Sequence, residues 1–526
     1  VRITPVDINE VKGAEAVTAG IQVTDTAIEY FVATDGDDKN PGTMDKPFAT
    51  LAKAKNTVRA LISKGLTSKI IVNLRGGDYR MNAGLNFDNS DSGTEEFPIV
   101  YQAYNGETVN LYGSKALDAS KITKVTDDAV LDKLIEKSAR DHLYQVKMSD
   151  LGISAPALNY NGASGKNVFY FNGTELINAR WPNADKSGDH FFVGAEGAEL
   201  TADEQGKYNG DNQPAKMKYK DETGRSKLWQ FKPGDMYAGG AFAYLWARQA
   251  VKLESLDTEN NILKTAEILN RGQLTYTAAD DRYLYFENIF EEIDVPGESY
   301  LDRDAGILYF YPVGDVEGAT LSLSTLTSTM LYNEGSKNIV FDGINIRESA
   351  ADAMLLGGSS SNITVKNATI SGIGGYGIRI WAPNTKIENN HLYNIANTAI
   401  KLNGGDRTTL SSSGSVVKNN LIHSCSAWAD TAIETEGVGH VISHNKIYEY
   451  DMGGVRLSNV NNVVVEYNEF YDCQQLNADG GVVYFGRNVS DLGNIIRNNY
   501  FHHIGNKIGA HGQQAIFTED GNVGPA

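Results

Sequence analysis

Two aspartates, Asp472 and Asp479, have the residue type and spacing that paired-carboxylate chemistry requires. Cleavage of a glycosidic bond with retention needs two carboxyl groups about 5 Å apart, one ionised to attack and one protonated to assist departure, whereas the inverting course needs roughly 6.5–9.5 Å to admit a water. Two close carboxylates repel each other as anions, which raises one pKa and separates the acid from the base. The alternative interpretation is structural: Asp472 caps a strand, and Asp479, which precedes two glycines, serves a turn.

Four further acids offer alternatives to this pair. Glu519 and Asp520 end a short apolar run one repeat later, so in-register stacking could place either one beside Asp479 as the second carboxylate. Glu434 and Glu436 are two residues apart in a strand-like run and therefore share a face. They suit recognition of hydroxyl groups or a metal better than attack, and a solvated strand edge is the competing interpretation.

Residues that flank these acids in sequence are the predicted substrate contacts. An aromatic ring could stack on a sugar face, and Arg or His could hold hydroxyl groups, although each could equally be structural. We find no zinc-ligand spacing, phosphate-binding glycine loop or serine nucleophile motif, so the chemistry is predicted to need no metal or cofactor, with a structural Ca²⁺ ion left open. The predicted contacts are Trp428, Glu434, Glu436, Tyr484, Arg487 and His511.

Short apolar strands that end in Asn must position these residues. The trailing asparagines at 390, 420, 445, 468 and 499 are 30, 25, 23 and 31 residues apart. A period in the twenties, with three short strands per repeat, predicts an all-β parallel β-helix. Each coil cannot bury its own inner face, so the coils must stack, and Asn can form amide ladders between them.

The pattern divides the chain into four segments. Residues 1–29 are predicted to form an N-terminal strand or cap, 30–114 the first coils with a short helix near 51–64, 115–330 an inserted irregular β lobe, and 331–526 the core with the candidate carboxylates. A β-helix must cover its last coil. No cap is visible near residue 526, so we expect a segment outside this chain, such as a second polypeptide, to supply further coils.

Composition restricts the partners. A formal charge of −19 argues against nucleic acid and anionic membranes, and mildly against a strongly acidic polysaccharide. No apolar run reaches the roughly 18 residues of a membrane span, so no membrane insertion is expected. Cys425 and Cys473 hold similar places in two repeats and could stack in a disulfide, although two buried free thiols are the favoured interpretation.

Several motifs resemble bacterial extracellular glycoside hydrolases with a right-handed, pectate-lyase-like parallel β-helix. They are YFVATDGD and KPFAT within residues 30–50, RGGDY at 75–79, ARWPN at 179–183, PGESYLD at 296–302, GGDR at 404–407, EGVG at 436–439, EYNEFYD at 466–472 and DGGVVY at 479–484. The group includes lacto-N-biosidases, β-xylosidases and fucosidase-like enzymes. The resemblance covers most of residues 30–520 and implies an extracellular or bacterial cell-surface location and an oligosaccharide substrate.

The lacto-N-biosidase family carries its acid/base and nucleophile as two Asp seven residues apart. The resemblance therefore implies Asp472 as acid/base and Asp479 as nucleophile of a retaining enzyme that releases lacto-N-biose from lacto-N-tetraose-type glycans. A β-xylosidase or fucosidase-like enzyme and a polysaccharide lyase are the alternatives. Lyase chemistry needs clustered cations or Ca²⁺, and basic residues are sparse between Asn420 and Asn494. A non-catalytic glycan-binding adhesin is the third class.

Overall fold

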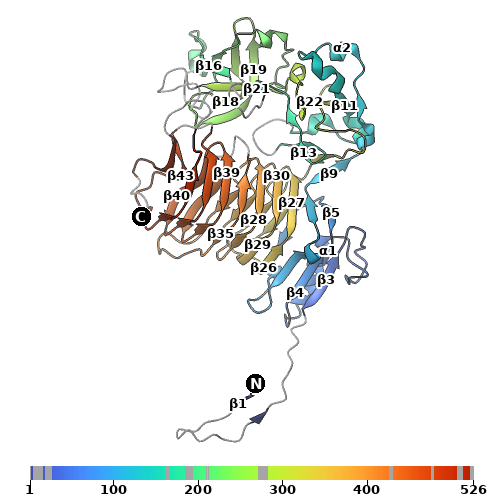
Figure 1. Ribbon diagram of the computed structural model, residues 1–526, viewed down its shortest axis with the longest axis vertical. Coiled ribbons are helices and arrows are strands. Elements are labelled where there is room, and N and C mark those ends of the chain that lie inside the picture. The colour runs from blue at the N-terminus through green and yellow to red at the C-terminus, as the bar shows by residue number, and fades with distance from the viewer. Residues whose placement is uncertain are drawn as a thin grey trace.

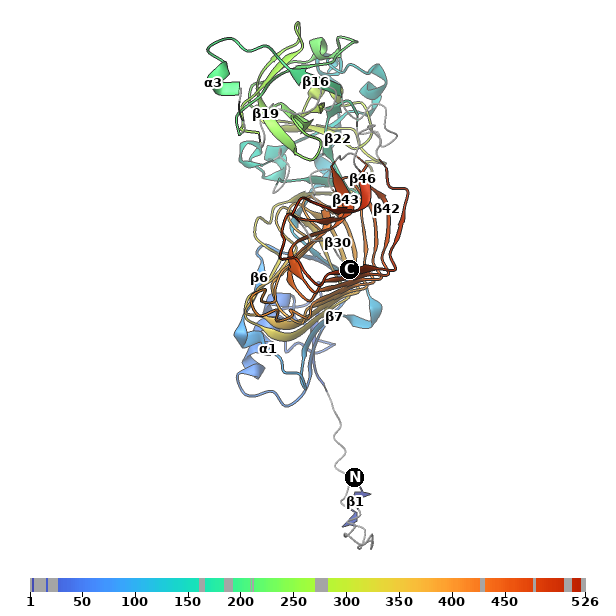
Figure 2. The ribbon, with the colours of Figure 1, turned by 90° about the vertical axis from the view of Figure 1, so that its left-hand side faces the viewer.

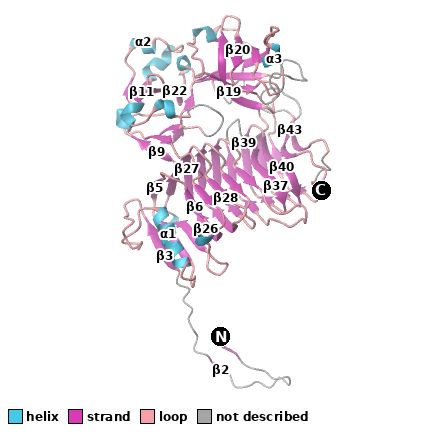
Figure 3. Ribbon diagram, turned by 180° about the vertical axis from the view of Figure 1, so that it is seen from behind, coloured by secondary structure: helices cyan, strands magenta, loops and turns pink. Residues whose placement is uncertain are grey.

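The chain is an all-β protein built on a right-handed parallel β-helix, as the repeats predict. The computed structural model describes residues 2–3, 16–17, 27–159, 166–183, 193–208, 210, 212–269, 282–425, 431–475, 479–505 and 513–521. The solenoid forms the middle of the molecule, with the helix α1 (Leu51–Ile62) beside its first coils and a β lobe along one side (Figures 1 and 2). Figure 3 shows how far strands outweigh helices.

Three parallel sheets make up the solenoid, and the chain visits them in a fixed order in every complete coil. Sheet 1 has ten strands: β3 (Ile28–Val32), β4 (Ile70–Leu74), β7 (Ile99–Ala103), β26 (Lys337–Asp342), β29 (Ser361–Lys366), β32 (Lys386–Glu388), β35 (Val416–Lys418), β38 (Val441–Ser443), β41 (Val464–Glu466) and β44 (Ile495–Arg497).

Sheets 2 and 3 have nine strands each. Sheet 2 consists of β5 (Gly77–Arg80), β8 (Val109–Tyr112), β27 (Ile344–Ser349), β30 (Thr369–Ile373), β33 (His391–Ile395), β36 (Leu421–His423), β39 (Lys446–Tyr450), β42 (Glu469–Cys473) and β45 (Tyr500–His502). Sheet 3 consists of β6 (Leu85–Phe87), β25 (Leu331–Asn333), β28 (Met354–Leu356), β31 (Ile378–Ile380), β34 (Ile400–Leu402), β37 (Thr431–Val438), β40 (Gly453–Asn461), β43 (Gly480–Phe485) and β46 (Gln513–Thr518).

Aliphatic columns and an asparagine ladder hold the coils together. Inward-facing Ile, Val and Leu side chains stack in register, as Ile387, Val417 and Ile442 do in sheet 1. At the turn from sheet 1 to sheet 2, the Nδ2 of Asn420 donates to the Oδ1 of Asn445 (3.0 Å), and Asn445 donates in the same way to Asn468 (3.0 Å). The predicted ladder is therefore confirmed.

The lobe is inserted between β8 and β25 and contains three sheets. The strands next to the solenoid are β9 (Ser114–Leu117), β12 (Phe169–Phe171), β13 (Thr174–Glu175) and β24 (Leu321–Ser324). A second sheet contains β10 (Thr123–Lys124), β11 (Tyr144–Lys147), β14 (Ile177–Asn178), β22 (Glu298–Asp302) and β23 (Ile307–Phe310). The third contains β15 (Arg180–Trp181), β16 (Val193–Gly197), β17 (Lys216–Tyr219), β18 (Tyr237–Ala241), β19 (Arg248–Asp257), β20 (Ile262–Thr265) and β21 (Tyr283–Glu287).

Smaller elements complete the described chain. The helices α2 (Asp128–Leu131) and α3 (Gln205–Tyr208) belong to the lobe, and β1 (Arg2–Ile3) pairs antiparallel with β2 (Ala16–Val17). Most of the predicted N-terminal cap, residues 1–29, lies outside the described residues. Within the described ranges, no helix is long and apolar enough to cross a membrane.

The two cysteines are buried free thiols, as expected. Tyr450 pairs with Cys473 in register, and Cys425 holds the equivalent place one coil earlier because His423 pairs with Tyr448. Equivalent positions two coils apart are separated by roughly 10 Å, which exceeds the Cα separation of about 7 Å that a disulfide tolerates. Tyr450 therefore keeps the thiols apart.

Candidate functional site

The turns from sheet 2 to sheet 3, here called the 2–3 corner, face the lobe (Figures 1 and 2). Near the first coils, the hydroxyl of Tyr170 on β12 donates to the Gly372 carbonyl (3.2 Å). Near the last coils, Nη1 of Arg248, at the start of β19, lies 3.9 Å from Oδ2 of Asp451. The lobe thus contacts this corner at two places along the solenoid.

Asp451 and Asp479 hold equivalent places at the 2–3 corner in successive coils. Val455 pairs with Val483 in sheet 3, and each aspartate precedes its valine by four residues. Counted from sheet 2, Tyr450 pairs with Cys473, so the turn that leads to Asp479 is five residues longer than the turn that contains Asp451. Asp479 is exposed, and 23% of the Asp451 side chain is exposed beside Arg248. A substrate could therefore reach both carboxylates.

Asp472 lies on the sheet 2 side of the same corner. It is half-buried on β42 with a φ of 49°, a left-handed conformation that recurs at the same place in neighbouring coils, at Ser424, Glu449 and His503. The fold therefore accounts for its backbone without a catalytic role. Burial raises the pKa of the Cys473 thiol to about 12, and the charges of Asp472 and Asp451 act in the same direction. Both carboxylates thus lie near one buried thiol.

Glu519 and Asp520 lie elsewhere, which corrects the prediction that one of them stacks beside Asp479. Glu519 donates its backbone N–H to the Phe485 carbonyl (3.1 Å), so it stands at the far end of β43 from Asp479. Seven residues of extended strand span roughly 23 Å, too far for a shared reaction centre. The repeat spacing therefore predicts the coil of Glu519 and Asp520 correctly, but not their position along the strand within that coil.

Glu519 is instead held by two of the predicted substrate contacts. Its carboxylate accepts hydrogen bonds from the Tyr484 hydroxyl (2.9 Å) and from Nη2 of Arg487 (2.8 Å). Burial opposes ionisation of Glu519, but these two donors outweigh it and lower its pKa. The three residues form a polar cluster on the outer face of sheet 3. Trp428 and His511, the remaining predicted contacts outside the glutamate pair, lie outside the described residues.

The outer face of sheet 3 carries an in-register row of four charged residues and a tyrosine. Arg379, Lys401, Glu434, Arg456 and Tyr484 occupy the same place in five successive coils. Nζ of Lys401 lies 3.1 Å from Oε2 of Glu434, and the Arg456 guanidinium lies 5.8 Å from the Tyr484 ring centre. Cations that are sparse in sequence are therefore aligned in space.

Glu434 is accordingly half of an ion pair. Glu436 lies two residues further along β37 and is half-buried. Among the residues that the structure describes, no group of three or more His, Cys, Asp or Glu side chains could hold a metal ion.

Sequence reasoning missed Asp451 and Arg248. A signal for Asp451 exists: the glycine of its Asp-Met-Gly-Gly run at 453 aligns with Gly481 of the Asp-Gly-Gly run at 479–481. Arg248 has no comparable signal, because it comes from the lobe and reaches the corner only through the folding of the insertion.

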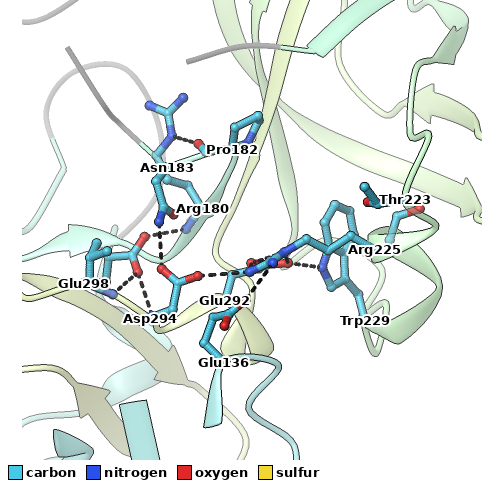
Figure 4. Close-up of polar contacts among 12 residues, drawn as sticks. Glu136, Arg180, Pro182, Asn183, Thr223, Arg225, Trp229, Glu292, Asp294 and Glu298 are labelled. Atoms are coloured by element: carbon cyan, nitrogen blue, oxygen red, sulfur yellow. Dashed lines mark hydrogen bonds and ion pairs between the residues drawn. The ribbon is translucent and has the colours of Figure 1, made fainter. Parts of the chain in front are cut away.

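A separate group of buried charges lies inside the lobe (Figure 4). The Arg225 guanidinium binds Glu292 (2.7 Å between Nη2 and Oε2) and Asp294 (3.0 Å to Oδ2), and Glu292 also accepts from the Trp229 indole N–H (2.5 Å). Nearby, burial raises the pKa of Glu298 to about 8, although its carboxyl accepts the Arg180 backbone N–H (3.1 Å). Glu292 and Glu298 are fully buried, so this network stabilises the lobe rather than contacting substrate.

Comparison with known proteins supports the fold. The family model of a right-handed beta helix region matches residues 313–434 and 384–525. A solved structure described as a glycoside hydrolase is 13% identical with a TM-score of 0.57, over 93% of this chain and 97% of that one. The complex of XylC with xylose is 14% identical with a TM-score of 0.49, over 93% of this chain and 68% of the other.

A GH136 lacto-N-biosidase from Eubacterium ramulus is 12% identical with a TM-score of 0.33, over 91% of this chain and 68% of its own. No protein of curated function matches the sequence. At these sequence identities the similarity to solved structures supports the β-helix fold and does not assign an activity.

Proposed function

We propose that this chain is a retaining glycoside hydrolase that acts on oligosaccharides at the 2–3 corner of its last coils. The observation that carries the proposal is that Asp451, Asp472 and Asp479 all lie at the 2–3 corner of two successive coils. A retaining enzyme needs two carboxyl groups about 5 Å apart at one place, one as nucleophile and one as acid/base. The proposed reaction needs no cofactor, and an extracellular or cell-surface location belongs to the same proposal.

Asp479 is the proposed nucleophile. It is exposed at the corner, and the resemblance to lacto-N-biosidases implies the same role. In this mechanism the Asp479 carboxylate attacks the anomeric carbon while a protonated carboxyl group gives its proton to the departing oxygen. Water then cleaves the glycosyl ester, and the second carboxylate takes the proton of that water.

Two aspartates compete for the acid/base role. Asp472 is favoured by the resemblance, and Asp451 by its place at the same corner as Asp479. The Arg248 guanidinium near Asp451 favours the ionised carboxylate there, which suits stabilisation of positive charge on the sugar better than proton donation. We therefore propose Asp472 as acid/base and Asp451 as a charge-stabilising neighbour.

Rates of the variants Asp451→Ala, Asp472→Ala and Asp479→Ala on a panel of aryl glycosides test these roles. Asp479→Ala should abolish turnover, and Asp472→Ala should lose about 10²–10⁴-fold. Azide should restore the Asp472→Ala rate on an activated aryl glycoside, with retained configuration in the glycosyl azide. Asp520→Ala, a matched surface change, should behave as wild type. Wild-type activity in all three variants, or an inverted first product, would sink the proposal.

Lacto-N-biose is the proposed sugar, on the resemblance of the motifs at 466–472 and 479–484. Incubation with lacto-N-tetraose should release the disaccharide lacto-N-biose. Release of xylose or fucose from the corresponding aryl glycosides would instead assign the chain a β-xylosidase-like or fucosidase-like activity.

A polysaccharide lyase is the second candidate, because sheet 3 aligns Arg379, Lys401 and Arg456. Two of these cations are paired, Arg379 with Asp352 and Lys401 with Glu434. Their charge is therefore largely neutralised before any uronate binds. Ultraviolet absorbance of an unsaturated product from alginate or pectin would establish the lyase instead.

A further inference from the structure

A groove of about 280 Å³ lies at the 2–3 corner in the coils that precede the candidate carboxylates. It is formed by the turns 350–352 and 374–376, together with Thr327 and Asn397. Its residues belong to the same series of turns that carries Asp451 and Asp479 further along the solenoid. The groove therefore lies on the same corner as the proposed active site.

Residue size explains why the corner is recessed here. The place held by Asp451 and Asp479, four residues before the first inward side chain of sheet 3, is held by Ala350, Gly374 and Ala396 in the earlier coils. Small side chains at this position leave the corner open in the coils that form the groove. The same column of positions carries Asp451 and Asp479 further along the solenoid.

The polar groups of the groove are fixed before any ligand binds. Oδ1 of Asp352 accepts the Tyr376 backbone N–H (2.9 Å), and Oδ2 pairs with the Arg379 guanidinium. That guanidinium also lies 5.2 Å from the Tyr376 ring centre. Gly375 is required, because a Cβ there would lie 2.3 Å from Oδ1 of Asp352. The groove thus presents a held carboxylate, an aromatic ring and the Asn397 amide.

This chemistry fits an uncharged sugar. Hydroxyl groups both donate and accept, so they suit a carboxylate beside an amide, and an aromatic ring suits the apolar side of a pyranose. Arg379 balances the charge of Asp352, so the groove offers little attraction to a uronate. The formal charge of −19 adds to this discrimination.

The distance from the carboxylates sets the length of the ligand. The turn that contains Asn397 precedes that of Asp451 by two coils and that of Asp479 by three. At about 4.8 Å per rung these separations are roughly 10 and 14 Å. A single sugar at the reaction centre would not reach the groove, whereas a chain along the corner would.

We propose that this groove is a distal subsite that binds a sugar unit away from the cleaved bond, so that the preferred substrate is an uncharged oligosaccharide lying along the 2–3 corner. The inference rests on the proposed glycosidase function. It adds a binding site for which the candidate carboxylates alone give no evidence.

Two variants test the subsite. Ala351→Trp should fill the groove, and Tyr376→Ala should remove its aromatic ring. We expect kcat/KM for lacto-N-tetraose to fall by about ten- to a hundredfold, the usual effect of losing one good contact surface, while the rate on a matching aryl glycoside stays unchanged. Tyr467→Ala, which removes a half-exposed tyrosine from a different corner, should change neither substrate. An unchanged ratio of the two rates in both groove variants would overturn the inference.

The two proposals fail separately. Turnover of an aryl glycoside by the wild type establishes the glycosidase whatever the groove does. If no glycoside is cleaved, calorimetric binding of lacto-N-tetraose and of xylotetraose to the wild type and to Ala351→Trp decides the subsite alone. Binding that only the filled variant loses would support the subsite, and binding equal in both proteins, or absent from both, would refute it.

Discussion

Removing one asparagine from the inner ladder should destabilise the solenoid far more than removing an exposed one. Asn445 lies in the middle of the ladder, with 1% of its surface exposed. Its Oδ1 accepts the backbone N–H of Asn420 (2.9 Å) and its Nδ2 donates to the Val417 carbonyl (3.0 Å). It also exchanges amide hydrogen bonds with the asparagines above and below. The perturbation is Asn445→Ala.

The magnitude follows from the groups left without partners. Asn420 loses the acceptor for its buried backbone N–H, which costs about 1–3 kcal/mol. The Val417 carbonyl loses one donor but stays within the ladder of β35 and β38, so it adds less. The side-chain amides of Asn420 and Asn468 keep other partners, so they add little.

Urea unfolding followed by circular dichroism measures the loss. The control is Asn86→Ala, because Asn86 is exposed on the outer face of sheet 3 and should change the free energy of unfolding by at most about 0.5 kcal/mol. Coils contact only their neighbours, so the transition of Asn445→Ala should also broaden. A loss below about 1 kcal/mol would refute the view that the ladder is a main source of stability.

Two further predictions concern buried ionisable groups. Burial lowers the pKa of His440 from 6.5 to about 4, so the unfolded chain binds more protons and stability is lost as pH falls from about 6.5 toward 4. His440→Gln should remove up to about 3 kcal/mol of that loss in urea unfolding at pH 4 and 7, and an unchanged pH dependence would contradict this. Arg225→Ala should cost about 3–5 kcal/mol because it leaves the buried carboxylate of Glu292 unpaired. The control is Arg497→Ala, which breaks the exposed pair with Glu466 and should cost less than about 1 kcal/mol. Similar losses from both variants in thermal unfolding would argue against a buried network.

The fold could be predicted because its physical signal is local and repeated. Asparagines such as Asn420 and Asn445 follow the last five sheet 1 strands, and their spacing gives the length of a coil. The ladder that this spacing predicts is present, and each of its amide hydrogen bonds joins two neighbouring coils. The shared column of Cys425 and Cys473 left a disulfide possible, and the favoured prediction of two free thiols is confirmed because Tyr450 lies between them.

The site could be predicted only in part, because its geometry depends on places within a coil and on the lobe. Repeat counting gives the coil of Glu519 but not the end of β43 at which it lies. The carboxylate of Asp451 becomes a candidate only when Val455 and Val483 fix the register. Arg248 approaches it from an insertion whose own fold the repeats say nothing about.

Two of the motifs that carry the family resemblance lie in the lobe, which explains why these two do not identify the sugar. The runs at 179–183 and 296–302 contribute Arg180, Asn183 and Glu298 to the buried network of the lobe (Figure 4). Mutually bonded, largely buried groups specify how the lobe packs. The residues that we propose to contact a sugar lie at the 2–3 corner, in turns whose lengths differ from coil to coil. Substrate choice should therefore follow changes at that corner, and an exchange of its turns should alter the sugar while the lobe and its network stay intact.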